Sequence, residues 1–131
     1  MESLATSTAG RWTGRVMSTV FVLFLLMDSV IKLIPIQPVI TTMTEMQLPV
    51  SMARPIGIIE LASLALYLWP RTAVLGAVLF TGVFGGAIAS HWRLDAPLFS
   101  HTLFGVYLGV LMWGGLWLRD AALRSLFPYR R

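Results

Sequence analysis

The chain has 131 residues, 56% of them hydrophobic, only 12% charged and none of them cysteine, with a net charge of +4. Soluble domains carry about 25% charged residues, so one compact membrane domain is expected, and the lack of thiols excludes disulfides, thiol redox chemistry and cysteine-ligated iron–sulfur clusters. The basic residues cluster toward the chain ends, which suits an anionic membrane surface and argues against a nucleic-acid partner.

The N-terminal residues 1–13 are mostly small and polar, which predicts a disordered cytoplasmic tail. The apolar run that follows has an alternative interpretation as a signal peptide, with Arg11 and Arg15 as its basic region. That run continues past Asp28 to Ile34, and no small-x-small cleavage site precedes Pro35. We therefore expect it to remain as a membrane helix.

Residues 14–131 are predicted to form one transmembrane domain of four helices. A spanning helix needs about 20 apolar residues, and the apolar segments run over residues 16–34, 50–69, 72–90 and 98–119. Prolines fall where they are tolerated, in the first turns of the second segment or at the end of the first. The fold class is therefore all-α, a transmembrane four-helix bundle.

Basic residues predict the orientation of the bundle. Four spans place both termini on one side, and that side carries more arginines than the other, which holds only Lys32, Arg54 and Arg93. Both termini should therefore face the cytoplasm. The long loop 35–54 and the shorter loop 90–97 then face outward.

Ionisable residues from all four helices should gather at the outer end of the bundle. Asp28 and Lys32 lie on one face of the first helix at i, i+4 spacing, where they can form an ion pair. Glu60 lies about one and a half turns into the second helix after Pro55, too deep for a short carboxylate to reach water easily. The candidate catalytic residues are Glu60, Asp28 and His91, and the candidate substrate-binding residues are Lys32, Arg54, Trp92, Arg93 and His101.

Each of these residues also has a purely structural interpretation. Lys32 and Arg54 are long enough to extend to the membrane interface, Asp28 with Lys32 is consistent with a structural ion pair, and the histidines with ordinary interface positions. Trp92 suits an interfacial aromatic belt. The methionines of the long loop (Met43, Met46 and Met52) give only a weak indication of a copper site, so no metal site is predicted.

Two small-xxx-small pairs, Gly82 with Gly86 and Gly105 with Gly109, predict close packing of the third helix against the fourth. Gly85 and Gly86 have an alternative role in making room for a ligand. Packing is the preferred interpretation.

Three stretches together resemble the DoxX-like family of small bacterial membrane proteins: "PVSMARPIGIIE", "LYLWPRTAVLGAVLFTGVFGGAIASHWR" and "WGGLWLRDAALRSLFP". The resemblance extends from about residue 27 to residue 128. It implies a four-helix bundle in the inner membrane. The wider DoxX family takes its name from a subunit of a thiosulfate:quinone oxidoreductase, and other members are linked to membrane redox or sulfur metabolism, but the resemblance assigns no catalytic residue to this chain.

Three functions remain open from the sequence. The first is an outer-leaflet polar site for a lipid-soluble small molecule or a quinone, in an enzyme or a subunit of a membrane oxidoreductase with redox partners. Glu60 or Asp28 would then move protons, and His91 or His101 would hydrogen-bond a carbonyl. The second is a non-catalytic assembly subunit of a membrane complex. The third is a transporter, which is less well supported because polar groups do not continue into the inner halves of the helices.

Overall fold

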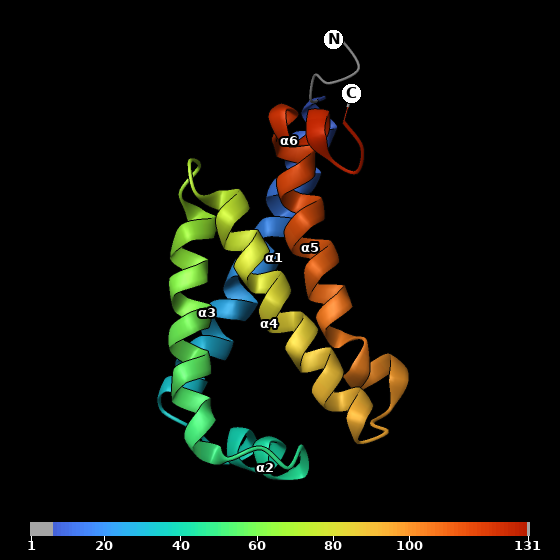
Figure 1. Ribbon diagram of the computed structural model, residues 1–131. Helices are drawn as coiled ribbons and strands as arrows, with labels where there is room; N and C mark the ends of the chain where they lie inside the picture. The colour runs from blue at the N-terminus through green and yellow to red at the C-terminus, as the bar shows by residue number, and fades with distance from the viewer. Residues whose placement is uncertain (1–6, 131) are drawn as a thin grey trace.

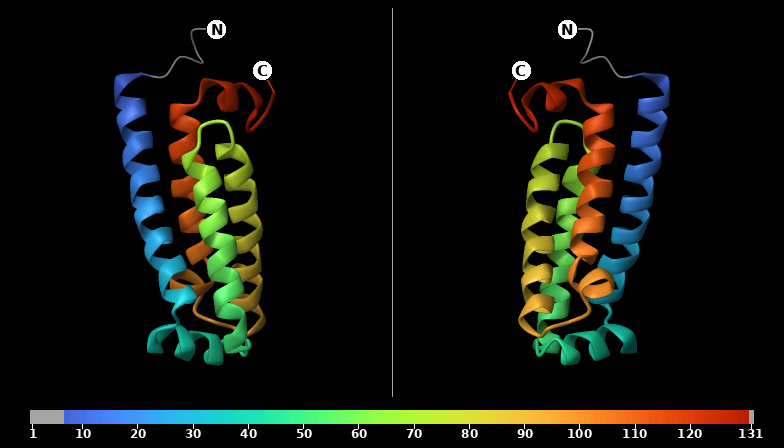
Figure 2. Two further views of the ribbon diagram at one scale, coloured as in Figure 1. Left: turned by 90° about the vertical axis from the view of Figure 1, so that its left-hand side faces the viewer. Right: turned by 90° about the vertical axis from the view of Figure 1, so that its right-hand side faces the viewer.

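The computed structural model describes residues 7–130, and within them four helices are long and apolar enough to cross a membrane. The spanning segments are α1 (Thr8–Leu33), η2 with α3 (Val50–Met52 and Ala53–Leu68), α4 (Ala73–Arg93), and η3 with α5 (Leu98–Thr102 and Phe104–Arg119). Helix α1 packs against α3 and α5, and α4 packs against the same two helices. The predicted all-α transmembrane four-helix bundle is confirmed. The start of α1 and the short helix α6 (Ala121–Leu126) lie at the same end of the bundle (Figures 1 and 2).

Helix α1 begins earlier than the sequence indicated. The side chain of Ser7 accepts a hydrogen bond of 2.9 Å from the backbone N–H of Gly10, which is the arrangement of a helix N-cap. Residues 8–13 are consequently helical and do not form a tail, while residues 1–6 of the predicted tail lie outside the described residues. Hydropathy locates the apolar part of a helix, and it overlooks a polar first turn of this kind.

The long loop between the first two spanning segments contains a helix, α2 (Gln37–Glu45), that was not predicted. It lies across the end of the bundle opposite α6 (Figures 1 and 2) and buries Val39 and Met43 against Ala53. Its C-terminus is closed by Gln47 with a positive φ of 55°, by the hydrogen bond from Gln47 N to Thr44 O and by that from Leu48 N to Met43 O. This is a Schellman motif, which satisfies carbonyl groups that a helix end otherwise leaves unpaired.

Aromatic side chains fill the centre of the bundle. Phe21 of α1 is fully buried, and its ring meets those of Tyr67 and Phe80 edge-to-face, with centroids 5.2 Å apart in both pairs. Phe84 stacks on Phe80 from the same helix. Such ring pairs add to the dispersion contacts that hold transmembrane helices together, because lipid supplies no hydrophobic driving force between helices.

One close contact between helices α1 and α5 is made by a different pair of glycines from the pairs that the sequence indicated. A methyl group on Gly115 of α5 would lie 2.8 Å from the backbone nitrogen of Ser18 and 2.9 Å from the carbonyl oxygen of Gly14, both on α1. By contrast, nothing lies within 4 Å of a methyl group placed on Gly82, Gly86 or Gly109, so these three positions do not pack against a neighbouring helix. Of the two predicted pairs, only Gly105 makes the expected close approach, to Phe84 O at 3.1 Å.

A buried hydrogen-bond chain links three helices toward the α6 end. The hydroxyl of Tyr67 donates to Met112 O at 2.7 Å and lies 2.9 Å from Ser18 Oγ. Arg119 Nη2 in turn donates to Ser18 Oγ at 2.9 Å. Since each polar atom finds a partner, this end of the bundle buries polar groups at little cost.

Candidate functional site

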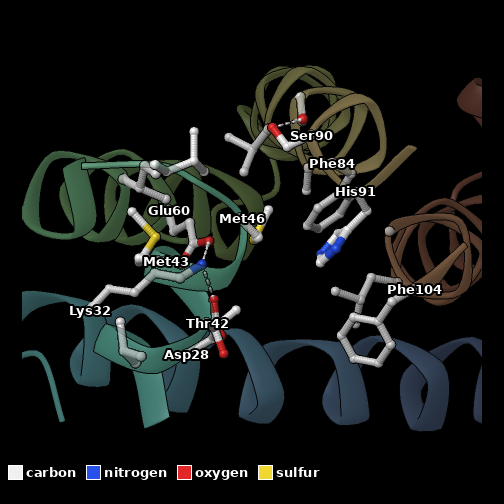
Figure 3. A pocket seen from close by; sticks show the side chains of 18 of the residues that line it. Asp28, Lys32, Thr42, Met43, Met46, Glu60, Phe84, Ser90, His91 and Phe104 are labelled. Carbon is white, nitrogen blue, oxygen red and sulfur yellow. Dashed lines mark hydrogen bonds and ion pairs between the residues drawn. The ribbon is translucent and has the colours of Figure 1, made fainter. Parts of the chain in front are cut away.

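An ion-pair cluster joins α1 and α3 near the α2 end of the bundle. Lys32 Nζ lies 2.6 Å from Asp28 Oδ2 and 2.7 Å from Glu60 Oε1, so one ammonium group serves two carboxylates (Figure 3). The predicted pairing of Asp28 with Lys32 is confirmed. Glu60 is only 2% exposed, whereas the side chains of Asp28 and Lys32 are each 22% exposed.

Gly57 explains why Glu60 reaches α1. A methyl group at Gly57 would lie 2.9 Å from Ser29 O and 3.1 Å from Lys32 Cβ, so α1 and α3 cross almost backbone to backbone at this point. Glu60 follows three residues later on the same face of α3. Its short side chain therefore spans the gap to Lys32 without leaving the interior of the bundle.

The cluster contains more negative charge than positive charge. Two carboxylates face one ammonium group, and Glu60 Oε2 is buried with no hydrogen-bond partner among the described residues. Burying an unsatisfied charged oxygen costs about 1–3 kcal/mol or more. Ionisable groups at membrane depth face a bundle interior or a cavity and frequently mark a function, so this unmet acceptor distinguishes the cluster from a balanced structural ion pair.

The cluster forms part of the wall of a cavity of about 510 Å³. In Figure 1, α4 leans away from α3 toward the α2 end, and residues of both helices near that end line the cavity together with α2. Its lining is mainly apolar and comes from all four spanning segments and from α2: Phe24, Leu25, Ile31, Val39, Met43, Met46, Leu48, Met52, Ile56, Ile59, Val83, Phe84, Ile88, Phe104 and Leu108, among others. A cavity of this size with a few polar groups is typical of a small-molecule site.

Two histidines form the other polar part of the lining. His91 comes from the last turn of α4 and His101 from the wide turn η3, and their ring centroids lie 5.8 Å apart. His101 Nδ1 lies 2.7 Å from Ser100 Oγ, whereas no side chain or backbone group in residues 7–130 hydrogen-bonds the ring of His91. Figure 3 shows His91 across the cavity from Glu60 and Lys32, beside Phe84 and Phe104.

Three predicted binding residues do not reach the cavity. Arg54 donates from Nε to Leu33 O at 3.2 Å, and Arg93 donates from Nη2 to Met46 O at 2.9 Å. Trp92 is 73% exposed on the outer surface of α4. The two arginines instead hold the chain before and after α2 against the bundle. Arg54 donates to a backbone carbonyl that precedes α2, and Arg93 donates to one that follows it.

The sequence interpretation missed the contribution of α2 and of the residues that follow it. Val39, Thr42 and Met43 line the cavity from α2, and Met46 and Met52 add to the same wall. Methionine is flexible and polarisable, so it adapts to ligands of different outline. The available signal was the spacing of Val39 and Met43 at i, i+4 directly after Pro38, which is the pattern of one apolar helix face beginning at a proline.

Gly86 was also assigned the less fitting of its two roles. It lines the cavity, and because it packs against nothing, its lack of a side chain leaves room inside the cavity. The alternative interpretation, in which this glycine makes space for a ligand, agrees better with the geometry.

Comparison with known proteins supports the resemblance seen in the sequence. The DoxX-like family matches residues 16–115, a stretch that begins in α1 and ends in α5. Searches of curated proteins and of solved structures find no significant match. Because the family match covers most of the chain, including every ionisable residue of the cavity wall, the chain belongs to the DoxX-like family.

Proposed function

We propose that this DoxX-like membrane protein binds a lipid-soluble small molecule with a polar head group. The molecule would occupy the cavity that α2 and the four spanning segments line, and a quinone is one candidate. The observation that carries this proposal is the unbalanced Asp28–Lys32–Glu60 cluster in the wall of an otherwise apolar cavity. Such a cluster is expensive inside a membrane protein. We therefore propose that these charges contact the polar head group of a ligand, because an apolar core by itself does not require them.

The size and polarity of the cavity support this class of ligand. Small-molecule sites occupy about 300–1,000 Å³, and this cavity of about 510 Å³ is large enough for a substituted ring. Lys32 supplies a hydrogen-bond donor on one side, and His91 supplies ring nitrogens on the other (Figure 3). A ring with oxygens at opposite ends, as in a quinone, is complementary to this arrangement, and the apolar lining accepts its hydrocarbon part.

The cluster also suits proton transfer. Asp28 and Glu60 are carboxylates in contact with the cavity, so either can accept a proton from a bound hydroxyl or return one to a bound carbonyl. In an oxidoreductase of this kind, the electrons pass to or from a partner redox protein. We therefore propose a role as a membrane subunit of an oxidoreductase, with the acids handling the protons.

The proposed orientation places this cavity toward the outer leaflet. Basic side chains at the α6 end include Arg11, Arg15, Arg71, Arg119, Arg124 and Arg130, and by the positive-inside rule this end faces the cytoplasm. We propose the bacterial inner membrane as the location. A ligand dissolved in the outer leaflet then lies at the depth of the cavity.

The variant Glu60→Gln tests the proposal, because an amide keeps the shape of the side chain and removes its charge. We expect the purified variant to unfold at nearly the same temperature in detergent and to bind a short-chain quinone at least about tenfold more weakly, because Glu60 holds in place the Lys32 ammonium group that donates to the quinone carbonyl. Binding is measured by titration calorimetry. Ser63→Ala is the matched control, since Ser63 is 1% exposed on the same helix and does not line the cavity.

A second outcome would favour the alternative, a structural cluster in an assembly subunit. In that case Glu60→Gln lowers the unfolding temperature and leaves quinone binding unchanged, or the natural protein binds neither a quinone nor a hydroxylated lipophile. Either result refutes the proposed binding site.

A further inference from the structure

We infer that the ligand of the cavity carries a free hydroxyl group that donates a hydrogen bond to the Asp28–Glu60 side of the wall. This inference rests on the proposed function and narrows its ligand class. It distinguishes a phenol, a hydroquinone or another hydroxylated lipophile from a molecule whose head group only accepts hydrogen bonds.

The Asp28–Lys32–Glu60 cluster has fewer hydrogen-bond donors than acceptor positions. The ammonium group of Lys32 has three N–H donors, while two carboxylates have four oxygens with roughly eight acceptor positions between them. Lys32 contacts Asp28 Oδ2 and Glu60 Oε1, and Glu60 Oε2 has no partner among the described residues. The wall therefore has fewer hydrogen-bond donors than acceptors.

A ligand in the cavity contacts the more exposed carboxylate of the cluster, which is Asp28. Glu60 is 2% exposed, but Asp28 retains 22% of its side-chain exposure and lines the cavity together with Lys32. A ligand hydroxyl that donates to Asp28 replaces the hydrogen bond that Lys32 gives to this carboxylate. The ammonium group is then released toward Glu60, whose second oxygen lacks a donor.

The other donors near the cluster in the described part of the chain do not bond to either carboxylate. Thr42 and Ser90 line the cavity, but neither forms a bond to Asp28 or Glu60, and the Ser90 hydroxyl donates to Gly86 O at 2.9 Å. Ser63 Oγ is one turn from Glu60 on α3, yet it too is buried without a partner. Because no protein group within residues 7–130 supplies the missing donor, it comes from water or from a ligand, and a ligand in the cavity that carries a hydroxyl takes the place of such a water.

The test compares two probes that differ only at the head group, a 4-alkylphenol and the methyl ether of the same phenol. Their binding to the purified full-length protein in detergent is measured by titration calorimetry. We expect the phenol to bind about ten- to hundredfold more tightly, which is the contribution of one hydrogen bond to a charged group. In Glu60→Gln and Asp28→Asn, whose walls carry one carboxylate fewer, the preference should fall below about threefold, and in Ser63→Ala it should persist.

Each result has a separate meaning. Equal binding of the two probes, or tighter binding of the ether, overturns the hydroxyl assignment and leaves the proposed function standing. If neither probe nor a short-chain quinone binds, the proposed function itself fails. A preference that persists in both acid variants places the hydroxyl at His91 and overturns the assignment. Using two acid variants keeps the test valid if one of them does not fold.

Discussion

The crossing of α1 and α5 allows a direct test of how the bundle is held together. In Gly115→Ala the new methyl group would lie 2.8 Å from Ser18 N and 2.9 Å from Gly14 O. Carbon atoms pack best at about 3.5–4.0 Å, so the two helices must separate by more than about 0.5 Å. Backbone atoms cannot rotate out of the way as a side chain can, so the whole crossing has to move.

The size of the effect follows from two contributions. Overpacking of this kind costs about 1–3 kcal/mol. The separation also weakens the bond from Arg119 to Ser18, at present 2.9 Å long, which contributes about 0.6–1 kcal/mol in a membrane protein. Gly115→Ala should therefore lose about 2–4 kcal/mol relative to an alanine placed in open space on the same helix.

Gly109→Ala is the matched control. Gly109 lies on α5, and nothing is within 4 Å of a methyl group added there. Both variants gain the same helix propensity of alanine over glycine, about 1 kcal/mol, so their difference reports the α1–α5 contact, its packing and the Arg119–Ser18 bond together. The free energy of unfolding is measured in mixed detergent micelles, with tryptophan fluorescence as the signal. If the two variants unfold within about 0.5 kcal/mol of each other, the close crossing at Gly115 is refuted.

Three further predictions concern other parts of the molecule. Tyr67→Phe removes the bond to Met112 O and the contact with Ser18, and it should cost about 1–2 kcal/mol in the same unfolding assay; a variant as stable as the natural protein would contradict the buried chain. Arg93→Ala frees Met46 O, so hydrogen exchange should accelerate in α2 and not in α4, whereas Arg71→Ala, an exposed change in the turn between α3 and α4, should leave both unchanged. A reporter fused to the C-terminus should be active only when it is of the type that requires the cytoplasm, and activity of a periplasmic reporter there would place the cavity on the cytoplasmic side.

Much of the architecture was predictable because it depends on local composition. A chain in lipid must satisfy its backbone polar groups within each helix, so the four long apolar segments were enough to predict four spanning helices. The same reasoning singled out Asp28, Lys32 and Glu60, since charges at membrane depth must turn inward, and the structure does bring these three side chains together. The family followed from local motifs as well.

Other features depend on which surfaces meet, and no local pattern determines this. The small-xxx-small pair at Gly82 and Gly86 looks like a helix contact, yet both glycines face open space, while Gly115 is pressed against Gly14 and Ser18 from a segment about a hundred positions earlier. Helix α2 buries only Val39 and Met43 in nine residues, so its signal in the sequence is limited to one i, i+4 pair after Pro38.

Two arginines near the α2 end show the same limit. Arg54 and Arg93 looked like binding residues because they share the depth of the cavity, but each reaches a backbone carbonyl far away in the chain, Leu33 O and Met46 O. Depth in the membrane is set by position within one helix and is therefore encoded locally. The direction in which a side chain points, and the partner it meets there, are set by the angles at which the helices cross, and only the tertiary structure determines those.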